Sequence, residues 1–204
     1  DEIELIHQEK QELTDPKKES DDKQVSVKKQ YRKGSGPKVN ITFKYYEFVS
    51  VNTNDIRDEM TKKTPIRYNG QKFVGSAEDQ IKYFFYAKQE DGYWYFDRVT
   101  TTVDVTFTMP KWTDYRKANR DQQGRWDEYY NSLLAHENGH KDIAIEAAKT
   151  IENELLKLKN FPKKDLLESK AKLIAKAILE RYRERQRQFD QETGHGVKTG
   201  VILH

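Results

Sequence analysis

The feature that most constrains this chain is the pattern H-E-x-x-H at residues 136–140, inside an apolar, helix-like stretch at residues 133–144. Two histidines four residues apart project from the same side of a helix, one turn apart, so both imidazoles can reach a common point. Zinc binds neutral imidazole nitrogens at about 2.0–2.1 Å. The pattern therefore predicts a helix that supplies two zinc ligands, His136 and His140.

Glu137 directly follows the first of these histidines. At this position a carboxylate can hold a water bound to the metal and accept its proton, which is the role of the glutamate in metalloproteases. The competing interpretation is an ordinary helix with two hydrogen-bonded core or surface histidines. The helical context and a third histidine downstream favour the metal site, with Glu137 as the catalytic base.

A catalytic zinc needs a third protein ligand and an open position for water. We predict His195 for this role, because the glycines on either side of it form a loop that can orient an imidazole freely. Its rival role is that of a proton donor or oxyanion stabiliser at the same site. Asp190 is predicted either to orient a ligand imidazole from behind or simply to end a helix. The other candidates for third ligand are Glu146, Glu168, Glu180 and Glu184.

The first half of the ordered chain has the pattern of a sheet. Apolar and polar residues alternate at residues 39–45 and 103–109, and residues 81–87 and 93–96 are also strand-like. The alternation shifts by one residue at Tyr45-Tyr46, which predicts a bulge. Asp91-Gly92 predicts a hairpin turn, and residues 54–63 predict a short helix. We expect a mostly antiparallel sheet of three to five strands with a small helix.

The second half has the pattern of helices. Apolar residues recur at steps of three and four over residues 122–158, and again from residue 165 until the helix ends near Phe189-Asp190. The fold class is therefore α+β, a sheet followed by two long helices of which the first carries the histidine motif. Residues 1–38 are rich in charge and lack an apolar period, which predicts a flexible tail before a single domain at residues 39–204.

Composition excludes several classes of function. The chain has no cysteine, so disulfides and cysteine-based zinc sites are absent. Its net charge of +3 comes from interspersed charges of both signs, which argues against a nucleic-acid partner. No apolar run is long enough to span a bilayer.

Several stretches resemble a bacterial family described as predicted secreted zinc-dependent proteases, also classified as a domain of unknown function. The family's ending resembles Tyr-Asp-x-x-Thr-x-His-Gly, of which this chain has all but the tyrosine, replaced by Phe189. The resemblance implies a zincin-like fold, a secreted or periplasmic bacterial location, and a site role for His195. The chain also lacks the cysteines that some relatives carry. The matching stretches are residues 45–48, 103–112, 126–140 and 189–196.

Together these features predict a zinc-dependent metallopeptidase with a peptide or protein substrate. By analogy with other zincins, the strand at residues 103–109 would pair with an extended peptide if it lies at a sheet edge. Two alternatives use the same residues: a zinc hydrolase of a non-protein amide, such as one in cell-wall material, and a non-catalytic domain that binds zinc structurally. A structural site is closed by four protein ligands, whereas a catalytic site keeps a position for water.

Overall fold

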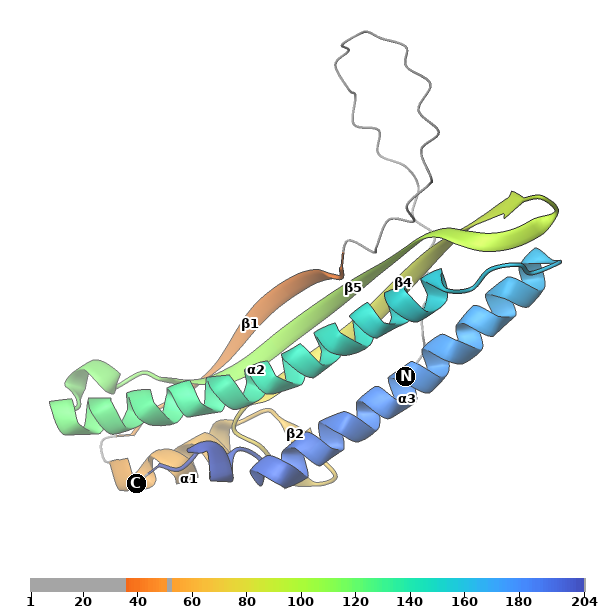
Figure 1. Ribbon diagram of the computed structural model, residues 1–204. Coiled ribbons are helices and arrows are strands. Elements are labelled where there is room, and N and C mark those ends of the chain that lie inside the picture. Colours follow the sequence, from red (N-terminus) through yellow and green to blue (C-terminus); the bar gives the residue numbers. More distant parts are fainter. Residues whose placement is uncertain (1–35, 51–52, 204) are drawn as a thin grey trace, which may run out of the picture.

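A computed structural model describes residues 36–50 and 53–203 of the chain. It has an α+β architecture in which a three-stranded sheet is followed by two long helices that lie side by side (Figure 1). This confirms the predicted fold class at the level of a sheet followed by two helices. Most of the predicted tail, residues 1–35, lies outside the described residues.

The main sheet has the strand order β1-β5-β4, with β1 at Lys38–Phe48, β4 at Ser76–Glu90 and β5 at Tyr93–Trp112. Strands β4 and β5 form an antiparallel hairpin, whereas β1 pairs with β5 in parallel. The prediction of a mostly antiparallel sheet was therefore wrong for β1. Alternation of apolar residues has the same period in parallel and antiparallel strands, so the pattern could not reveal the direction of β1.

Two further details of the sheet differ from the prediction. Residues 93–112 form one strand of 20 residues instead of two separate strands. The irregularity in pairing lies between Tyr86 and Ala87 of β4, not at Tyr45-Tyr46, where β1 and β5 stay in register. The predicted hairpin turn is confirmed, since Asp91 and Gly92 have φ values of 51° and 82°, the left-handed geometry of a two-residue turn.

The connection from β1 to β4 consists of small elements. The predicted short helix is present as α1, Thr53–Lys63, and a two-stranded hairpin follows, made of β2 at Arg67–Tyr68 and β3 at Gln71–Lys72. This segment returns the chain to the far side of β5. As a result β5 is the central strand, and β1 and β4 are the edges of the sheet.

The core lies between β5 and the first long helix, α2, Arg120–Leu156. The alternating side chains of β5 that face the helices are almost completely buried, and each contributes about 1.5–3 kcal/mol relative to an exposed position. Helix α2 begins with a capping box in which Asn119 and Gln122 bond each other's backbone N–H. The buried β5 side chains of this row are Val103, Val105, Phe107 and Met109.

The second long helix, α3, runs from Lys164 to Thr193 and packs beside α2. It ends at Gly194, whose left-handed φ of 59° is typical of a helix C-terminus. The helix is therefore three to four residues longer than its pattern predicted, and Asp190 lies on its last turn. After a turn at residues 194–196, a short 3₁₀ helix, η2, spans Val197–Thr199.

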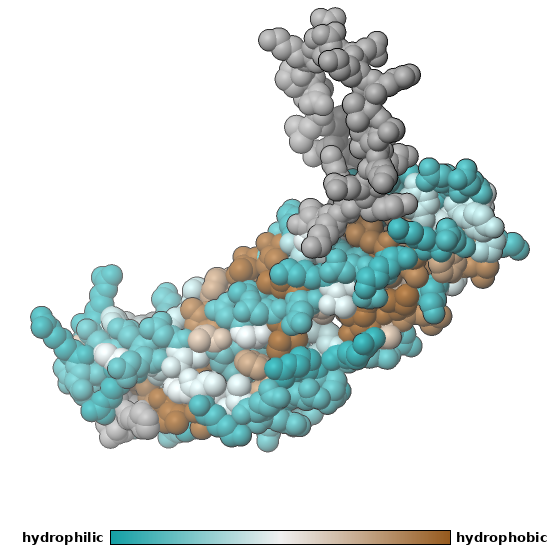
Figure 2. Space-filling view, in the orientation of Figure 1, coloured by the Kyte–Doolittle hydropathy of each residue, from teal (hydrophilic) through white to brown (hydrophobic). Residues whose placement is uncertain are grey.

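The edge strand β1 exposes apolar side chains on the side that faces the helices. Ile41, Phe43 and Tyr45 are 50%, 43% and 52% exposed, and Figure 2 shows brown, apolar surface in this part of the molecule. Helix α2 covers β5 and β4 but leaves this part of β1 open. None of the described helices is both apolar and long enough to cross a membrane.

Candidate metal centre

The histidine motif lies in the middle of α2, where that helix faces the last turns of α3. His136 and His140 point toward Asp190 of α3. One potential ligand atom from each of these three residues lies within 4.8 Å of the other two. Imidazole nitrogens and a carboxylate oxygen are donors that suit zinc, so this donor set fits the predicted metal.

The three side chains converge on a single atom. The Oδ1 oxygen of Asp190 lies 3.4 Å from Nε2 of His136 and 3.1 Å from Nε2 of His140. The same oxygen lies 3.5 Å from Nδ1 of His195. All three imidazoles named by the sequence are therefore arranged around one carboxylate oxygen, although they come from positions up to 59 residues apart.

His195 differs from the other two histidines in its exposure. Its side chain is 59% exposed, against 5% for His136 and 14% for His140. Its backbone has a φ of 53°, in the left-handed region, and its N–H donates to the carbonyl of Asp190 at 2.8 Å. The turn thus ties His195 back to the end of α3, while its ring stays outside the group of three that lie within 4.8 Å.

His136 is held mainly by packing. The ring of Phe189 lies nearly parallel to it, with 5.1 Å between ring centroids and an interplanar angle of 12°. Nδ1 of His136 is buried and has no hydrogen-bond partner among the described residues. Gly139 makes this packing possible, because a Cβ there would lie 2.3 Å from Cζ of Phe189. Phe189 is thus the group that approaches α2 at Gly139.

His140 is held by hydrogen bonds. Its Nδ1 lies 2.5 Å from Oε1 of Gln186, and its Nε2 faces Asp190. Burial lowers the pKa of His140, but hydrogen bonds to Asp190 and Gln186 and the charges of Asp190 and Glu137 outweigh burial, so its pKa is raised. A proton on Nε2 here occupies the direction that a metal ion would take, and metal binding would release it.

Asp190 remains ionised among these imidazoles. Burial raises its pKa, but hydrogen bonds from His136 and His140 and the charges of His140 and His195 together lower the pKa by more. The pKa of Asp190 is therefore held well below its usual range. A carboxylate that keeps its charge beside three imidazoles gives the site a negative centre, which favours a bound cation.

Glu137 lies deep beside this group, with only 5% of its surface exposed. Burial raises its pKa, whereas the charges of His140 and His136 and a hydrogen bond from the backbone of Ala77 lower it by a smaller amount. Gly75, just before β4, allows the strand to approach closely, because a Cβ there would lie 3.0 Å from Oε1 of Glu137. A carboxyl with a raised pKa is better able to hold and then deliver a proton near neutral pH.

The structure separates the predicted candidates for the metal site. It brings His136, His140, His195, Glu137 and Asp190 together, as described above. The four glutamates considered as third ligands are not part of the group with metal-ligand spacing that the described residues form. Two of them are engaged elsewhere: Glu168 with Lys164, and Glu184 with Arg187.

Sequence reasoning predicted Asp190 but missed Gln186 and Tyr182, which support the site from behind. Tyr182, Gln186 and Asp190 are spaced by four along α3, so they share one face of that helix and meet the two histidines, which are spaced by four on α2. That repeated spacing was the available signal. The hydroxyl of Tyr182 donates to Asp79 of β4, which extends the network to the sheet.

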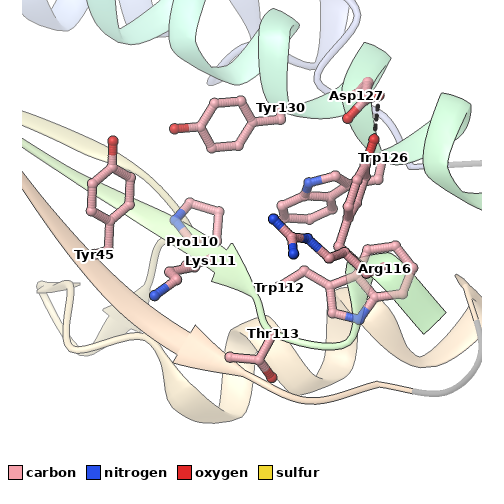
Figure 3. Close-up of a pocket in the computed structure, with 10 residues that line it drawn as sticks. Tyr45, Pro110, Lys111, Trp112, Thr113, Arg116, Trp126, Asp127 and Tyr130 are labelled. Atoms are coloured by element: carbon pink, nitrogen blue, oxygen red, sulfur yellow. Dashed lines mark hydrogen bonds between the residues drawn. The ribbon is translucent and has the colours of Figure 1, made fainter. Parts of the chain in front are cut away.

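A separate cavity of about 630 Å³ lies beside the N-terminal part of α2 (Figure 3). Tyr130 lines it from α2, and six residues of helix place Tyr130 about 120° around the axis from His136. Asp127, the only acidic residue among its described lining, accepts a hydrogen bond from Tyr115 at 2.8 Å. Aromatic rings dominate its walls, and none of the described lining residues is a histidine, so this cavity is distinct from the candidate metal centre.

Comparison with protein families gives a match that covers most of the chain. Residues 43–196 match the family described as bacterial protein of unknown function, DUF922. Neither a curated protein nor a solved structure matches the chain. The matched range includes most of the sheet, the histidine motif, Asp190 and His195, so the whole candidate metal centre lies within it. The chain is therefore a member of this bacterial family.

Proposed function

We propose that this protein is a zinc-dependent metallopeptidase whose centre is built from His136, His140, Asp190 and Glu137. The observation that carries the proposal is the convergence of imidazole nitrogens on one ionised carboxylate oxygen, directly beside a buried glutamate of raised pKa. Perturbed ionisable groups gathered around a metal-ligand set are typical of hydrolytic sites.

Two residues compete for the third ligand position. Asp190 is favoured by distance, because its oxygen already lies within 4.8 Å of both motif nitrogens. His195 is the residue predicted from the sequence, and its exposed ring is carried by a turn of three successive left-handed residues. We assign the metal to His136, His140 and Asp190, and His195 to the solvent side, where it can contact a substrate.

The chemistry follows from these positions. A bound zinc ion would supply a Lewis acid that polarises a carbonyl and lowers the pKa of water. Glu137 accepts the proton of the attacking water and later delivers it to the leaving amine. Asp190 would contribute a charged carboxylate oxygen to the ligand set, which offsets part of the charge of the ion. His195 lies at the exposed side, in a position to donate to a developing oxyanion.

A peptide substrate is supported by the edge of the sheet next to the site. Residues 103–109 do not meet the condition for peptide pairing, because β5 is the central strand and not an edge. The edge strand at the site is β4, whose first residues approach Glu137 through Gly75 and Ala77. An extended peptide that adds to β4 would present its backbone carbonyls near Glu137, which is the geometry of strand addition. Strand β4 thus replaces β5 in the proposed substrate site.

Metal content and turnover test the proposal directly. The purified protein should contain about one zinc per chain, lost in His136→Ala and His140→Ala. Glu137→Gln should keep the metal and lose cleavage of a mixed peptide library, because the amide cannot accept the water's proton. A variant that cleaves the library as fast as the unaltered protein would refute the role of Glu137.

A second pair of variants assigns the third ligand. If Asp190 is the ligand, Asp190→Ala should lose zinc under conditions where His195→Ala retains it and loses mainly turnover. The reverse result would assign the metal to the three histidines. Glu184→Ala is a suitable control, because Glu184 is an exposed carboxylate on the same helix.

One observation favours a second function, a non-catalytic zinc-binding domain. A fourth potential donor lies close to the group of three, since Nδ1 of His195 is 3.5 Å from Oδ1 of Asp190. If all four bound zinc, the site would be closed and would hold metal only for stability. Cobalt substitution distinguishes the two cases, because a four-coordinate site without water shows no spectral change when an inhibitor such as a hydroxamate is added.

A further inference from the structure

Gln186 occupies a place behind the proposed metal ligand His140 that the proposed reaction does not use. Its side chain is half-buried on α3 and contacts α2 twice. Oε1 lies 2.5 Å from Nδ1 of His140, and Nε2 donates to the backbone carbonyl of the same residue at 3.1 Å. The amide therefore clamps both the ring and the main chain of one histidine.

The direction of this amide follows from chemistry. A backbone carbonyl has no proton to donate, so the group of Gln186 that faces it must be the NH₂. The amide oxygen then faces the imidazole, and because that oxygen can only accept, Nδ1 of His140 must carry a proton. When the ring of His140 gives up its second proton, the lone pair is therefore left on Nε2, the atom that faces Asp190.

The orientation of Gln186 is itself fixed by a second residue. Its Nε2 also donates to the hydroxyl of Tyr182 at 2.8 Å, one turn earlier on α3. That hydroxyl donates in turn to Asp79 on β4. The acceptor at the end of this chain is a carboxylate, so the Tyr182 proton points to Asp79 and leaves the hydroxyl oxygen free to accept from Gln186.

From these contacts we infer that Gln186 is the positioning residue of the metal centre, which selects the tautomer of His140 that presents Nε2 to the metal. The inference rests on the proposed function. His136 has no such partner, since its Nδ1 is unpaired among the described residues and its ring is held by Phe189. The two motif histidines are thus oriented in different ways, one by packing and one by the chain Gln186–Tyr182–Asp79.

Zinc affinity is the first test. Loss of a hydrogen bond behind a metal-binding histidine typically weakens metal affinity about 10–100-fold. We expect this loss in Gln186→Leu, measured by competition with a chromophoric chelator at neutral pH. Gln186→Glu should recover most of the affinity, because a carboxylate oxygen still accepts from Nδ1. Gln188→Leu is the matched control, an exposed glutamine two residues along the same helix, and should bind zinc normally.

A spectroscopic measurement separates positioning from a merely structural role. Long-range ¹H–¹⁵N correlation spectra of the metal-free protein, recorded at a pH where imidazoles are neutral, report the tautomer of each ring. His140 should be protonated on Nδ1 in the unaltered protein and in Gln186→Glu, and should shift to a mixture in Gln186→Leu. Tyr182→Phe should give an intermediate mixture, because it frees the amide without removing it.

The outcomes distinguish this inference from the proposed function. If the unaltered protein binds no zinc, the proposed function fails, while the tautomer spectra still decide the role of Gln186. If it binds zinc and Gln186→Leu binds equally well with an unchanged tautomer, Gln186 has no positioning role and the metal site stands without it. A Gln186→Leu variant that fails to fold leaves Gln186→Glu and Tyr182→Phe to decide by the same two readouts.

Discussion

Replacing Gly139 by alanine tests whether the contact between α2 and Phe189 holds the metal centre in shape. In a helix interior alanine is favoured over glycine by about 1 kcal/mol, so helix propensity alone predicts that the variant is more stable. The structure predicts the opposite. A Cβ at position 139 would lie 2.3 Å and 2.8 Å from two ring atoms of Phe189, well inside contact distance.

The size of the effect follows from two opposing terms. Overpacking a tight contact costs about 1–3 kcal/mol, which offsets or exceeds the gain of about 1 kcal/mol from helix propensity. Gly124 provides the matched control, because it lies in the same helix and a Cβ there would meet nothing within 4 Å. We expect Gly124→Ala to stabilise the protein and Gly139→Ala to be less stable than Gly124→Ala by about 1–3 kcal/mol.

Thermal unfolding of the metal-free protein measures this difference. For a chain of this length 1 kcal/mol corresponds to roughly 2–4 °C, so the melting temperatures of the two alanine variants should differ by roughly 2–12 °C. Zinc affinity should also fall in Gly139→Ala, because Phe189 can no longer lie flat on His136. The double variant with Phe189→Ala should lose this coupling. Equal stabilisation by the two glycine substitutions would refute the reasoning.

Three further predictions concern stability. Because burial raises the pKa of Glu137, ionising this carboxyl destabilises the metal-free folded protein. The destabilisation is absent below the ordinary carboxyl pKa and grows as pH rises. Glu137→Gln should therefore gain stability relative to the unaltered protein between pH 4 and pH 7, measured by thermal unfolding in EDTA. Glu152 is buried and accepts from the N–H and hydroxyl of Thr101 at 2.9 and 2.7 Å, so Glu152→Ala should cost about 2–4 kcal/mol in urea unfolding, and Glu152→Gln less. Zinc at about 1,000 times its Kd should raise the free energy of unfolding by about 4 kcal/mol and the melting temperature by roughly 8–16 °C. Equal melting temperatures in zinc and in EDTA would contradict the proposed metal site.

The helices were the part of the fold that the sequence predicted best. Their boundaries depend on local signals, such as the asparagine cap of α2 and the glycine that ends α3. The exception was informative, because α3 continues through Asp190 to Thr193, whose hydroxyl donates to the carbonyl of Phe189 at 2.7 Å. Strand direction was not predictable, because β1 joins β5 through a connection whose path depends on tertiary packing.

The site was predictable to different depths for its different residues. His136, His140 and Glu137 follow from a spacing of four within one helix, which is a local property. The approach of Asp190 and His195 to the motif depends on how α3 returns beside α2. Their residue types therefore suggested a role at the site, but the sequence pattern could not give their distances from His136 and His140. Gln186 was missed for a further reason: its spacing of four from Asp190 is informative only when the residue that it faces is known.

The geometry around Asp190 also explains how the protein can keep this site assembled without a metal ion. Three imidazole nitrogens lie 3.1–3.5 Å from one carboxylate oxygen. They would repel that oxygen if they offered only lone pairs, so protons must lie between the nitrogens and the oxygen. The site is thus held together by charge-assisted hydrogen bonds that already gather the proposed ligands. It follows that metal uptake should exchange protons for the ion with little movement of α2 or α3. Hydrogen exchange at the amides of residues 133–144 should accordingly slow on zinc addition, without the appearance of a newly folded segment, whereas a large increase in helical circular dichroism on zinc binding would show that the site is not preassembled.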